Sequence, residues 1–523
     1  MQTRAAADAI HDSTKHGTRP VQPERLVQYH RLDPGNAPEP FKRYRNRPFH
    51  PLPRALVPST HPAVAVLSGA QGDRKPLDAS LLATLLYLTA GVTRATAASA
   101  ARKIYFRAAM SAGNLHPVEV YVVAGPGIAG VPAGVHHFAP LEFGLTELRS
   151  GDFRDSVSLS APVLLIFTGL VWRTTWKYGE RGWRHLYWDT GAMLANLLAA
   201  TEAHGVDAKI FAGFADQTVT DLLGIDGVDE IPLALVALGP QAEIKTPPIS
   251  HLAPLNFEVA PVAPDPIRLP LVVEAQAGSA LTVDEIDEWL LAARTVSSKM
   301  PISIDSPASA PEEPIESVIL RRGSTRAMRH DSISQHQLMW PLAAATRAVA
   351  MDATPGGTLL EHYINAHAID GLQPGAYRWS RPSVKPIAGN ESARKVSAEL
   401  CLNQPLGGDS AYTVFHNARL DPIMDALGSR GYRVAQLEAG IVCGRLALAA
   451  FALGLGASGL TFFDDLVSKY FGTSATPMLV TAVGVPNTIP APAGSPGAPA
   501  TLSGYHRLMD QIAFQLRRSA ELH

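Results

Sequence analysis

The sequence predicts a protein of mixed helices and strands in which one supersecondary unit occurs twice. Residues 182–224 and 431–472 each begin with Gly, an aromatic residue and Arg, and continue into a long apolar helix. A turn, a short strand, an Asp-containing turn and a second helix follow in both copies. Each copy then closes on an apolar strand with a Gly-Pro or Gly-x-Pro break, LALVALGP and MLVTAVGVP. Two such copies predict a duplicated, pseudo-symmetric pair whose related faces pack together.

Proline-rich segments separate these two units from the rest of the chain, because proline disfavours helix interiors and central strands. The predicted divisions are an N-terminal extension (1–60), module 1 (61–245), a Pro-rich linker (246–314), module 2 (315–487) and a Pro/Ala/Gly spacer with a C-terminal helix (488–523). Outside the modules, helical spacing predicts short helices near Ala5–Lys15, at Thr282–Arg294 and at 501–520.

Composition excludes several classes of protein. The chain has 523 residues, 46% hydrophobic and 18% charged, with a formal net charge of −2, so it is globular and lacks the basic surface of a nucleic-acid binder. Its charged N-terminus and the lack of about 18 consecutive apolar residues predict neither a signal peptide nor a membrane span. Only two cysteines are present, Cys401 and Cys443, which favours a cytoplasmic protein.

Two patterns that suggest other sites are set aside. The sequences Gly125–Gly130 and Gly454–Gly459 both read GxGxxG. The first is followed by a segment that cannot open a helix and the second ends a helix, whereas a Rossmann site needs a strand, the Gly-rich turn and then a helix. His136 and His137 lie between turn residues without partners at ligand spacing, so no metal site is predicted.

The loop Arg107–Pro117, RAAMSAGNLHP, precedes the alternating strand VEVYVVA. It offers the Ser111 hydroxyl, backbone N–H groups near Gly113, the Asn114 amide and the His116 imidazole. Such a loop suits the edge of a planar hydrogen-bonding ring or a phosphate. The alternative is an ordinary junction between a loop and a strand.

A second polar segment, Ile319–Ala327, contains RRGSTR. Arginine binds phosphate bidentately, and a neighbouring hydroxyl adds another hydrogen bond. Arg322, Ser324 and Arg326 are therefore candidate phosphate ligands. The alternative is a solvated charged stretch, which the apolar residues Val318–Leu320 immediately before it disfavour.

These two segments resemble the motifs of a flavoenzyme family. SAGNLHP is similar to the PSSGNxQPW-type loop of FMN nitroreductases, and RRGSTR is similar to their RRSxR phosphate motif. The closer resemblance is to the SagB/ThcOx dehydrogenases, which oxidise azoline rings to azoles in modified peptides. It is carried by STKH (Ser13–His16) with PFKRY (Pro40–Tyr44), by SAGNLHPVEVYVV, by Val135–Arg154 and by WKYGERGWRHLYWDTG (Trp176–Gly191).

The resemblance implies an α+β nitroreductase fold in which the tandem modules form an intramolecular pseudo-dimer with FMN at their interface. It also implies that Lys177 and Tyr178 carry the proton chemistry. Transfer of hydride to flavin N5 requires loss of a proton from a neighbouring atom, and a lysine of lowered pKa or a tyrosine polarised by it can accept that proton. The alternative is that both residues merely precede a helix at the surface. The chain departs from the family pattern at His116, usually Tyr, at Ala192, often His, and in the extra residue of RRGSTR.

The two modules keep complementary parts of such a site. Module 1 has the SAGN loop but no Arg-rich opening, whereas module 2 has RRGSTR but lacks Asn in the loop Thr354–Glu361. Module 2 also has Ala426 and Leu427 where module 1 has Lys177 and Tyr178. We therefore expect one composite FMN site with these ligands: Ser111, Gly113, Asn114 and His116 from module 1, and Arg322, Ser324, Arg326, Gly459 and Leu460 from module 2. Two sites, with Arg102, Lys103 or Arg107 as the second phosphate clamp, are the alternative.

The predicted function is FMN-dependent oxidation of an azoline-type or related small or peptide-borne substrate. An NAD(P)H-dependent nitro- or quinone reductase is the alternative among enzymes. A catalytically inactive FMN-binding or scaffold protein is the alternative from another class, against which the retained Lys177 and Tyr178 argue. The resemblance admits a peptide-modifying synthetase complex as a partner.

Overall fold

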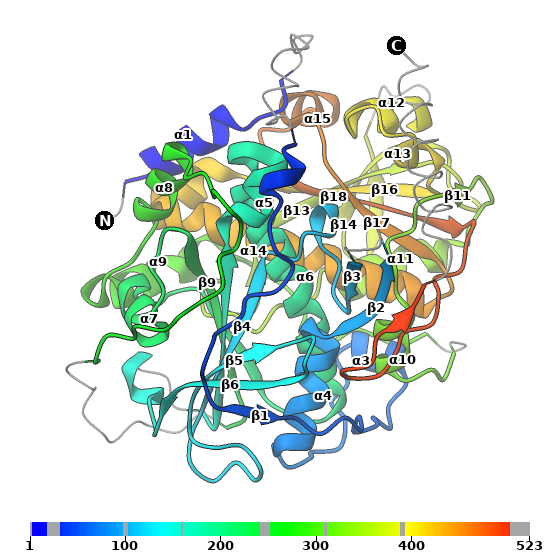
Figure 1. Cartoon of the computed structure of the whole chain (residues 1–523). Helices are drawn as coiled ribbons and strands as arrows, with labels where there is room; N and C mark the ends of the chain where they lie inside the picture. The colour runs from blue at the N-terminus through cyan, green and yellow to red at the C-terminus, as the bar shows by residue number, and fades with distance from the viewer. Residues whose placement is uncertain are drawn as a thin grey trace.

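The computed structural model describes residues 3–17, 32–97, 103–157, 161–240, 252–307, 311–387 and 393–502. Two large sheets dominate this part of the chain, and two long helices, α6 and α14, lie at the centre of the molecule (Figure 1). The central strands of the two sheets repeat in the same order, as the sequence repeat predicts, whereas the outermost strands and some of the short helices differ.

The first sheet belongs to the N-terminal half and has the strand order β1-β6-β5-β4-β7-β9-β8. All its neighbouring strands are antiparallel. Its strands are β1 (Phe49–Pro51), β4 (Val118–Ala124), β5 (Gly134–Ala139), β6 (Gly144–Ser150), β7 (Val163–Leu170), β8 (Ala208–Phe211) and β9 (Glu230–Leu238). The helices of this half are α3 (Ala63–Leu67), α4 (Ala79–Ala90), α5 (Val171–Tyr178), α6 (Gly182–Ala203) and α7 (Asp216–Leu223).

The second sheet has the order β11-β18-β16-β13-β14-β15, with β17 also paired to β18. Its strands are β11 (Met328–Arg329), β13 (Leu360–Ala366), β14 (Gly375–Ser380), β15 (Ser383–Pro386), β16 (Tyr412–Ala418), β17 (Gly456–Leu460) and β18 (Thr476–Pro486). Its helices are α10 (Ile315–Arg321), α11 (Gln335–Ala345), α12 (Ala393–Leu400), α13 (Pro405–Asp409), α14 (Leu420–Ala452) and α15 (Asp464–Phe471).

The central helices α6 and α14 cross at two glycines. A Cβ on Gly191 would lie 2.4 Å from the Leu437 carbonyl oxygen, and one on Gly440 would lie 2.5 Å from that of Trp188. The backbones therefore approach more closely than any larger residue allows. The indole N–H of Trp188 also donates to Gln436 across the interface, at 2.6 Å. This crossing fixes the two halves against each other.

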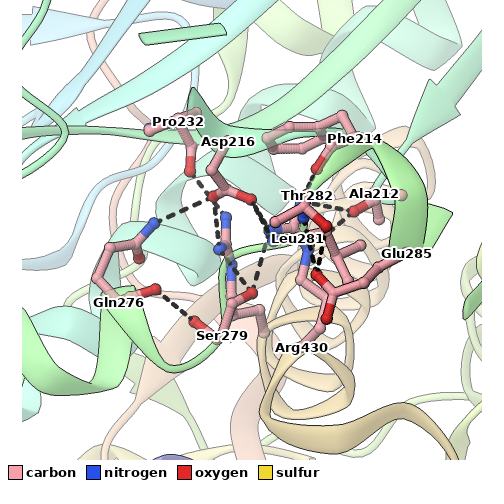
Figure 2. Close-up of polar contacts among 12 residues, drawn as sticks. Ala212, Phe214, Asp216, Pro232, Gln276, Ser279, Leu281, Thr282, Glu285 and Arg430 are labelled. Carbon is pink, nitrogen blue, oxygen red and sulfur yellow. Dashed lines mark hydrogen bonds and ion pairs between the residues drawn. The ribbon is translucent and has the colours of Figure 1, made fainter. Parts of the chain in front are cut away.

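Two buried ion-pair clusters repeat this relation on either side of the crossing. Asp216 at the start of α7 accepts from Arg430 and Arg433 of α14, at 2.5 and 2.8 Å (Figure 2). In the reciprocal cluster, Asp464 at the start of α15 accepts from Arg184 of α6 at 2.7 Å. Arginines of each half thus neutralise a buried carboxylate of the other, as expected for an isologous contact.

The segments outside the two halves also pack on them. The helix predicted near Ala5–Lys15 is α1 (Ala5–Ser13), and the one predicted at Thr282–Arg294 is a 3-10 turn, η5 (Val283–Glu285), leading into α9 (Ile286–Val296). The short α8 (Pro270–Ala277) differs from the expectation that the prolines of this segment disfavour a helix. Pro270 stands at the first helical position, where the missing N–H costs nothing. The remaining short elements are η1 (Pro34–Asn36), β2 (Val92–Ala97), β3 (Lys103–Arg107), η2 (Ala112–Asn114), η3 (Arg154–Val157), η4 (Gly179–Arg181), β10 (Ser298–Lys299), β12 (Gly357–Thr358) and β19 (Ala500–Thr501).

The C-terminal spacer returns to the first half, where β19 pairs in parallel with β2. The helix predicted at 501–520 lies almost wholly outside the described residues. Within the described chain one helix, α14, is long and apolar enough to cross a membrane by those criteria alone. Its most apolar stretch is completely buried in the protein, which is the environment of a core helix. Neither GxGxxG sequence opens a helix: the first joins β4 to β5 and the second joins α14 to β17.

Candidate active site at the interface of the two halves

The loop before β4 is held on α6 by a buried carboxylate. The Ser111 hydroxyl donates to Asp189 at 2.5 Å, and the Ala112 N–H donates to the same carboxylate at 3.0 Å. Ser111 Oγ in turn accepts the N–H of His116 at 2.8 Å. Burial raises the pKa of Asp189 to about 7, while the two hydrogen bonds act in the opposite direction. Asp189 therefore holds the loop directly at Ser111 and Ala112, and Ser111 in turn holds His116.

Gly113 at the tip of this loop packs directly against Lys177 and Tyr178. Its backbone is left-handed, with φ of 62°. A Cβ there would lie 2.5 Å from the Tyr178 hydroxyl and 3.0 Å from Lys177 Nζ. Glycine is thus required both for the conformation and for the close approach. Next to it, the Asn114 amide donates to the Tyr105 carbonyl at 2.8 Å and its oxygen lies 3.0 Å from His116 Nε2.

Lys177 and Tyr178 end α5, immediately before Gly179 with φ of 55°. Burial lowers the pKa of Lys177, and the positive charge of Arg326 lowers it further. Burial raises the pKa of Tyr178, with Asp189 adding to the rise and Arg326 opposing it. Arg326 comes from the second half of the chain. Its charge therefore reaches the Lys177–Tyr178 pair of the first half.

The three arginines of the RRGSTR segment differ in their partners and in their exposure to solvent. Arg321 pairs with Glu313 at 2.6 Å. Arg322 is buried and donates to the Ala108 carbonyl of the first half at 2.8 Å. Its Nε has no hydrogen-bond partner among the described residues. Burial lowers the pKa of Arg322 to about 10, and the positive charge of Arg94 adds to this lowering. Ser324 is half-buried and Arg326 is exposed.

The later turn of the second half lies beside these groups. The N–H of Thr325 donates to Ala457 in β17 at 3.0 Å, which joins the RRGSTR segment to this strand. In β17, Gly459 is exposed and Leu460 is buried. A Cβ on Gly459 would approach Cys443 Sγ no closer than 3.6 Å, so one side of the strand is open. The buried Thr461 hydroxyl lacks a partner within the described chain.

Comparison with known proteins decides the family. The profile described as the nitroreductase family matches residues 73–240 and 281–485, which together are more than half of the chain. The chain belongs to the nitroreductase family. The two matched segments confirm the tandem modules predicted from the sequence, and the protein is an oxidoreductase of this superfamily.

Individual relatives cover parts of the chain. The trifolitoxin-processing protein TfxB of Rhizobium leguminosarum bv. trifolii is 31% identical over 204 residues, 35% of this chain and 54% of that protein. The microcin B17-processing protein McbC of Escherichia coli is 27% identical over 142 residues, 25% of this chain and 52% of that protein. The chain therefore spans about half the length of these two curated relatives.

A solved nitroreductase-like structure from Anabaena variabilis matches with a TM-score of 0.69 at 24% identity. It covers 93% of this chain and 100% of that chain. At this identity the match concerns the fold alone, and it confirms the predicted α+β nitroreductase fold across both modules.

The module 2 loop and strand β8 form the pseudo-symmetric counterpart of this candidate site, and this counterpart is built differently. Glu438 of α14 accepts from Thr358 and the Leu359 N–H at 2.5 and 2.9 Å, as Asp189 does from its own loop. However, the strand equivalent to β17 is β8, where Ile210 is buried. Ile210 donates to the Ala350 carbonyl at 2.8 Å and accepts from Asp352 at 3.1 Å. The loop of module 2 thus lies directly on β8.

Further contacts close this second position. The carboxylate of Asp352 accepts the N–H groups of Ala212 and Gly213 at 2.8 and 3.0 Å. The linker adds Ser298 and Lys299, which pair as a strand with Thr358 and Gly357. At the candidate site beside the module 1 loop, the first position, the residue equivalent to Ile210 is Gly459, which is exposed. Within the described residues, the first position is thus exposed at Gly459, whereas the second is covered by the module 2 loop and the linker.

Sequence reasoning missed the carboxylates that hold both loops. Asp189 and Glu438 stand two residues before the crossing glycines, in the sequences DTG and EAG. Burial raises the pKa of each to about 7. The acid-x-Gly pattern occurs at the same place in both repeats, and this shared spacing is the signal in the sequence for a common role.

Proposed function

We propose that this nitroreductase is an FMN-dependent dehydrogenase of the SagB/ThcOx type with one composite site. The observation that carries the proposal is the close contact of Gly113 with Lys177 and Tyr178 in module 1, where the charge of Arg326 from module 2 lowers the pKa of Lys177. Neither module alone contains all of these groups. The arrangement brings together a loop that could bind the edge of a flavin ring, a candidate general base and a candidate phosphate-binding segment.

The residues present fit a flavin mononucleotide. Arg322 is buried with an unsatisfied Nε, which suits a guanidinium that meets an anionic ligand. Arg322, Ser324 and Arg326 would hold the terminal phosphate. Ser111, Gly113, Asn114 and His116 would face the ring or ribityl chain from one module, and Gly459 and Leu460 from the other. The absence of a Rossmann element favours FMN over FAD.

Lys177 and Tyr178 would handle the proton of the reaction. FMN supplies a hydride acceptor at N5. Desolvation and Arg326 lower the pKa of Lys177, so more of it is the neutral amine that can accept a proton. The Tyr178 hydroxyl adjoins the same glycine and would transmit or donate the proton. Gly113 lets both groups reach the loop edge.

A single site predicts one FMN per chain. The exposed Gly459 supports binding at the first position, and the buried Ile210 argues against a second flavin at the other. We expect saturation of the purified protein with FMN to give one flavin per chain by absorbance against protein concentration. A ratio near two would refute the single-site proposal, and release of FAD would refute the choice of cofactor.

The substrate proposed is an azoline ring or a related group on a small molecule or peptide. Support comes from the resemblance and from TfxB and McbC, which are named for processing trifolitoxin and microcin B17. A peptide-modifying synthetase complex in the cytoplasm is the proposed setting. The test compares oxygen-dependent oxidation of an azoline peptide with consumption of NAD(P)H. Turnover of NAD(P)H with a nitro compound or quinone, without azoline oxidation, would support the reductase alternative.

A further inference from the structure

Three adjacent strands at the edge of the first sheet bring two histidines and a glutamate together, well outside the groups described above. His136 of β5 pairs with Glu147 of β6, so their side chains share a face. His50 of β1 pairs with Leu145, two residues from Glu147, and therefore points to the same face. One ligand atom from each side chain lies within 4.8 Å of the others.

His136 has one nitrogen available to a ligand. Its Nε2 lies 3.0 Å from the Pro132 carbonyl oxygen, which can only accept a hydrogen bond. Nε2 therefore carries the hydrogen, and Nδ1 keeps its lone pair. This Nδ1 is buried and has no partner among the described residues, in a side chain whose residue is 0% exposed. A histidine that donates one N–H to a backbone carbonyl and keeps the other nitrogen bare is arranged as metal-bound histidines are.

The other two side chains are placed to complete a coordination shell. His50 Nε2 and Glu147 Oε2 lie 3.1 Å apart, and their side chains are 34% and 18% exposed. Arg47 donates to the main-chain carbonyl of Glu147 at 3.0 Å and leaves its carboxylate to His50. The partial exposure of these two side chains leaves the cluster accessible to a cation from solvent.

We propose that His50, His136 and Glu147 bind one divalent transition metal ion, zinc by ligand type, with water in the fourth position. Imidazole nitrogens favour zinc over calcium or magnesium, which take oxygen ligands. Ligands at about 2.0–2.2 Å from tetrahedral zinc lie about 3.4 Å apart. The 3.1 Å between His50 Nε2 and Glu147 Oε2 is close to this separation, and all three ligand atoms lie within 4.8 Å of one another. The sequence predicts no metal site here because the partners of His136 lie on other strands and not at ligand spacing in the chain.

The site would tie the N-terminal arm to module 1. β1 is a strand of three residues at the sheet edge, and the arm continues from it toward the rest of module 1 (Figure 1). A metal bound to β1, β5 and β6 together stabilises the folded protein in proportion to its occupancy. The role is structural and independent of the proposed flavin chemistry.

The test is zinc titration of the FMN-loaded full-length protein by calorimetry, with Tm measured with zinc and with a chelator. We expect one zinc ion per chain and a higher Tm with zinc. Glu147→Gln and His50→Ala should each weaken binding by more than the roughly 10- to 100-fold that loss of a supporting group costs. His330→Ala, which alters an exposed histidine paired with Asp409, is the matched control and should bind zinc as the wild type does.

Failure of the wild type to bind zinc would overturn the proposal. So would equal affinity in the wild type and in a folded Glu147→Gln or His50→Ala variant. Two variants are used because either alone could disturb the sheet edge, and His50 is the more exposed of the two residues. Since flavin content is measured in the same samples, loss of zinc binding with normal FMN would leave the proposed function untouched.

Discussion

Replacement of Gly113 by alanine probes the contact between the loop and the Lys177–Tyr178 pair. The new Cβ would lie 2.5 Å from the Tyr178 hydroxyl, whereas ordinary contacts begin at 3.4 Å. The hydroxyl would therefore have to move by about 0.9 Å, and displacement of a reacting group by about 1 Å costs about 100-fold in rate. The left-handed backbone adds roughly 1–2 kcal/mol of destabilisation for alanine.

Gly127 offers a matched control for the backbone effect. It also has a left-handed φ, of 91°, but a Cβ there would meet no atom within 4 Å. Gly127→Ala should lose a similar free energy of unfolding and keep its activity. The assay is bleaching of the flavin absorption by substrate at saturating FMN, with FMN affinity and unfolding measured separately. Equal turnover by Gly113→Ala and Gly127→Ala would refute the proposed position of the Lys177–Tyr178 pair.

The remaining predictions address the other groups of the site. Lys177→Ala and Tyr178→Phe should keep FMN bound but slow turnover by about 10²- to 10⁴-fold, the range for a general base; near-normal rates would make the pair structural. Arg326→Ala should weaken FMN retention by about 1.5–3 kcal/mol in equilibrium dialysis, whereas Arg329→Ala, at an exposed arginine paired with Asp331, should retain FMN normally. Asp189 has a raised pKa of about 7, so its contribution to stability is full below its ordinary 3.8 and is lost as the pH rises through about 7. Urea unfolding of wild type and Asp189→Asn across this range should show that difference, and a pH-independent difference would contradict it.

The sequence alone determined the division into two related modules. The repeat at 182–224 and 431–472 has one spacing from the Gly-aromatic-Arg opening through the crossing glycine, and that pattern depends only on local helix and strand periodicity. It also brought out the SAGN and RRGSTR segments, since motifs of contiguous residues are visible without a fold. The family match to residues 73–240 and 281–485 confirms the two tandem modules.

Only the tertiary structure decided which groups meet. Arg326 and Lys177 are far apart in the chain, and it is the crossing of α6 and α14 at Gly191 and Gly440 that brings the two modules together. The reciprocal pairing of each module's arginines with the other's aspartate is equally invisible in either repeat alone.

The histidine cluster shows the same limit most clearly. His50, His136 and Glu147 are separated by 86 and 11 positions, so no ligand spacing appears in the sequence. Strand register places them on one face, and register is set by long-range pairing of β1, β6 and β5. Chemistry carried by contiguous residues can therefore be predicted from this sequence, whereas chemistry assembled across strands and modules is fixed only when the chain folds.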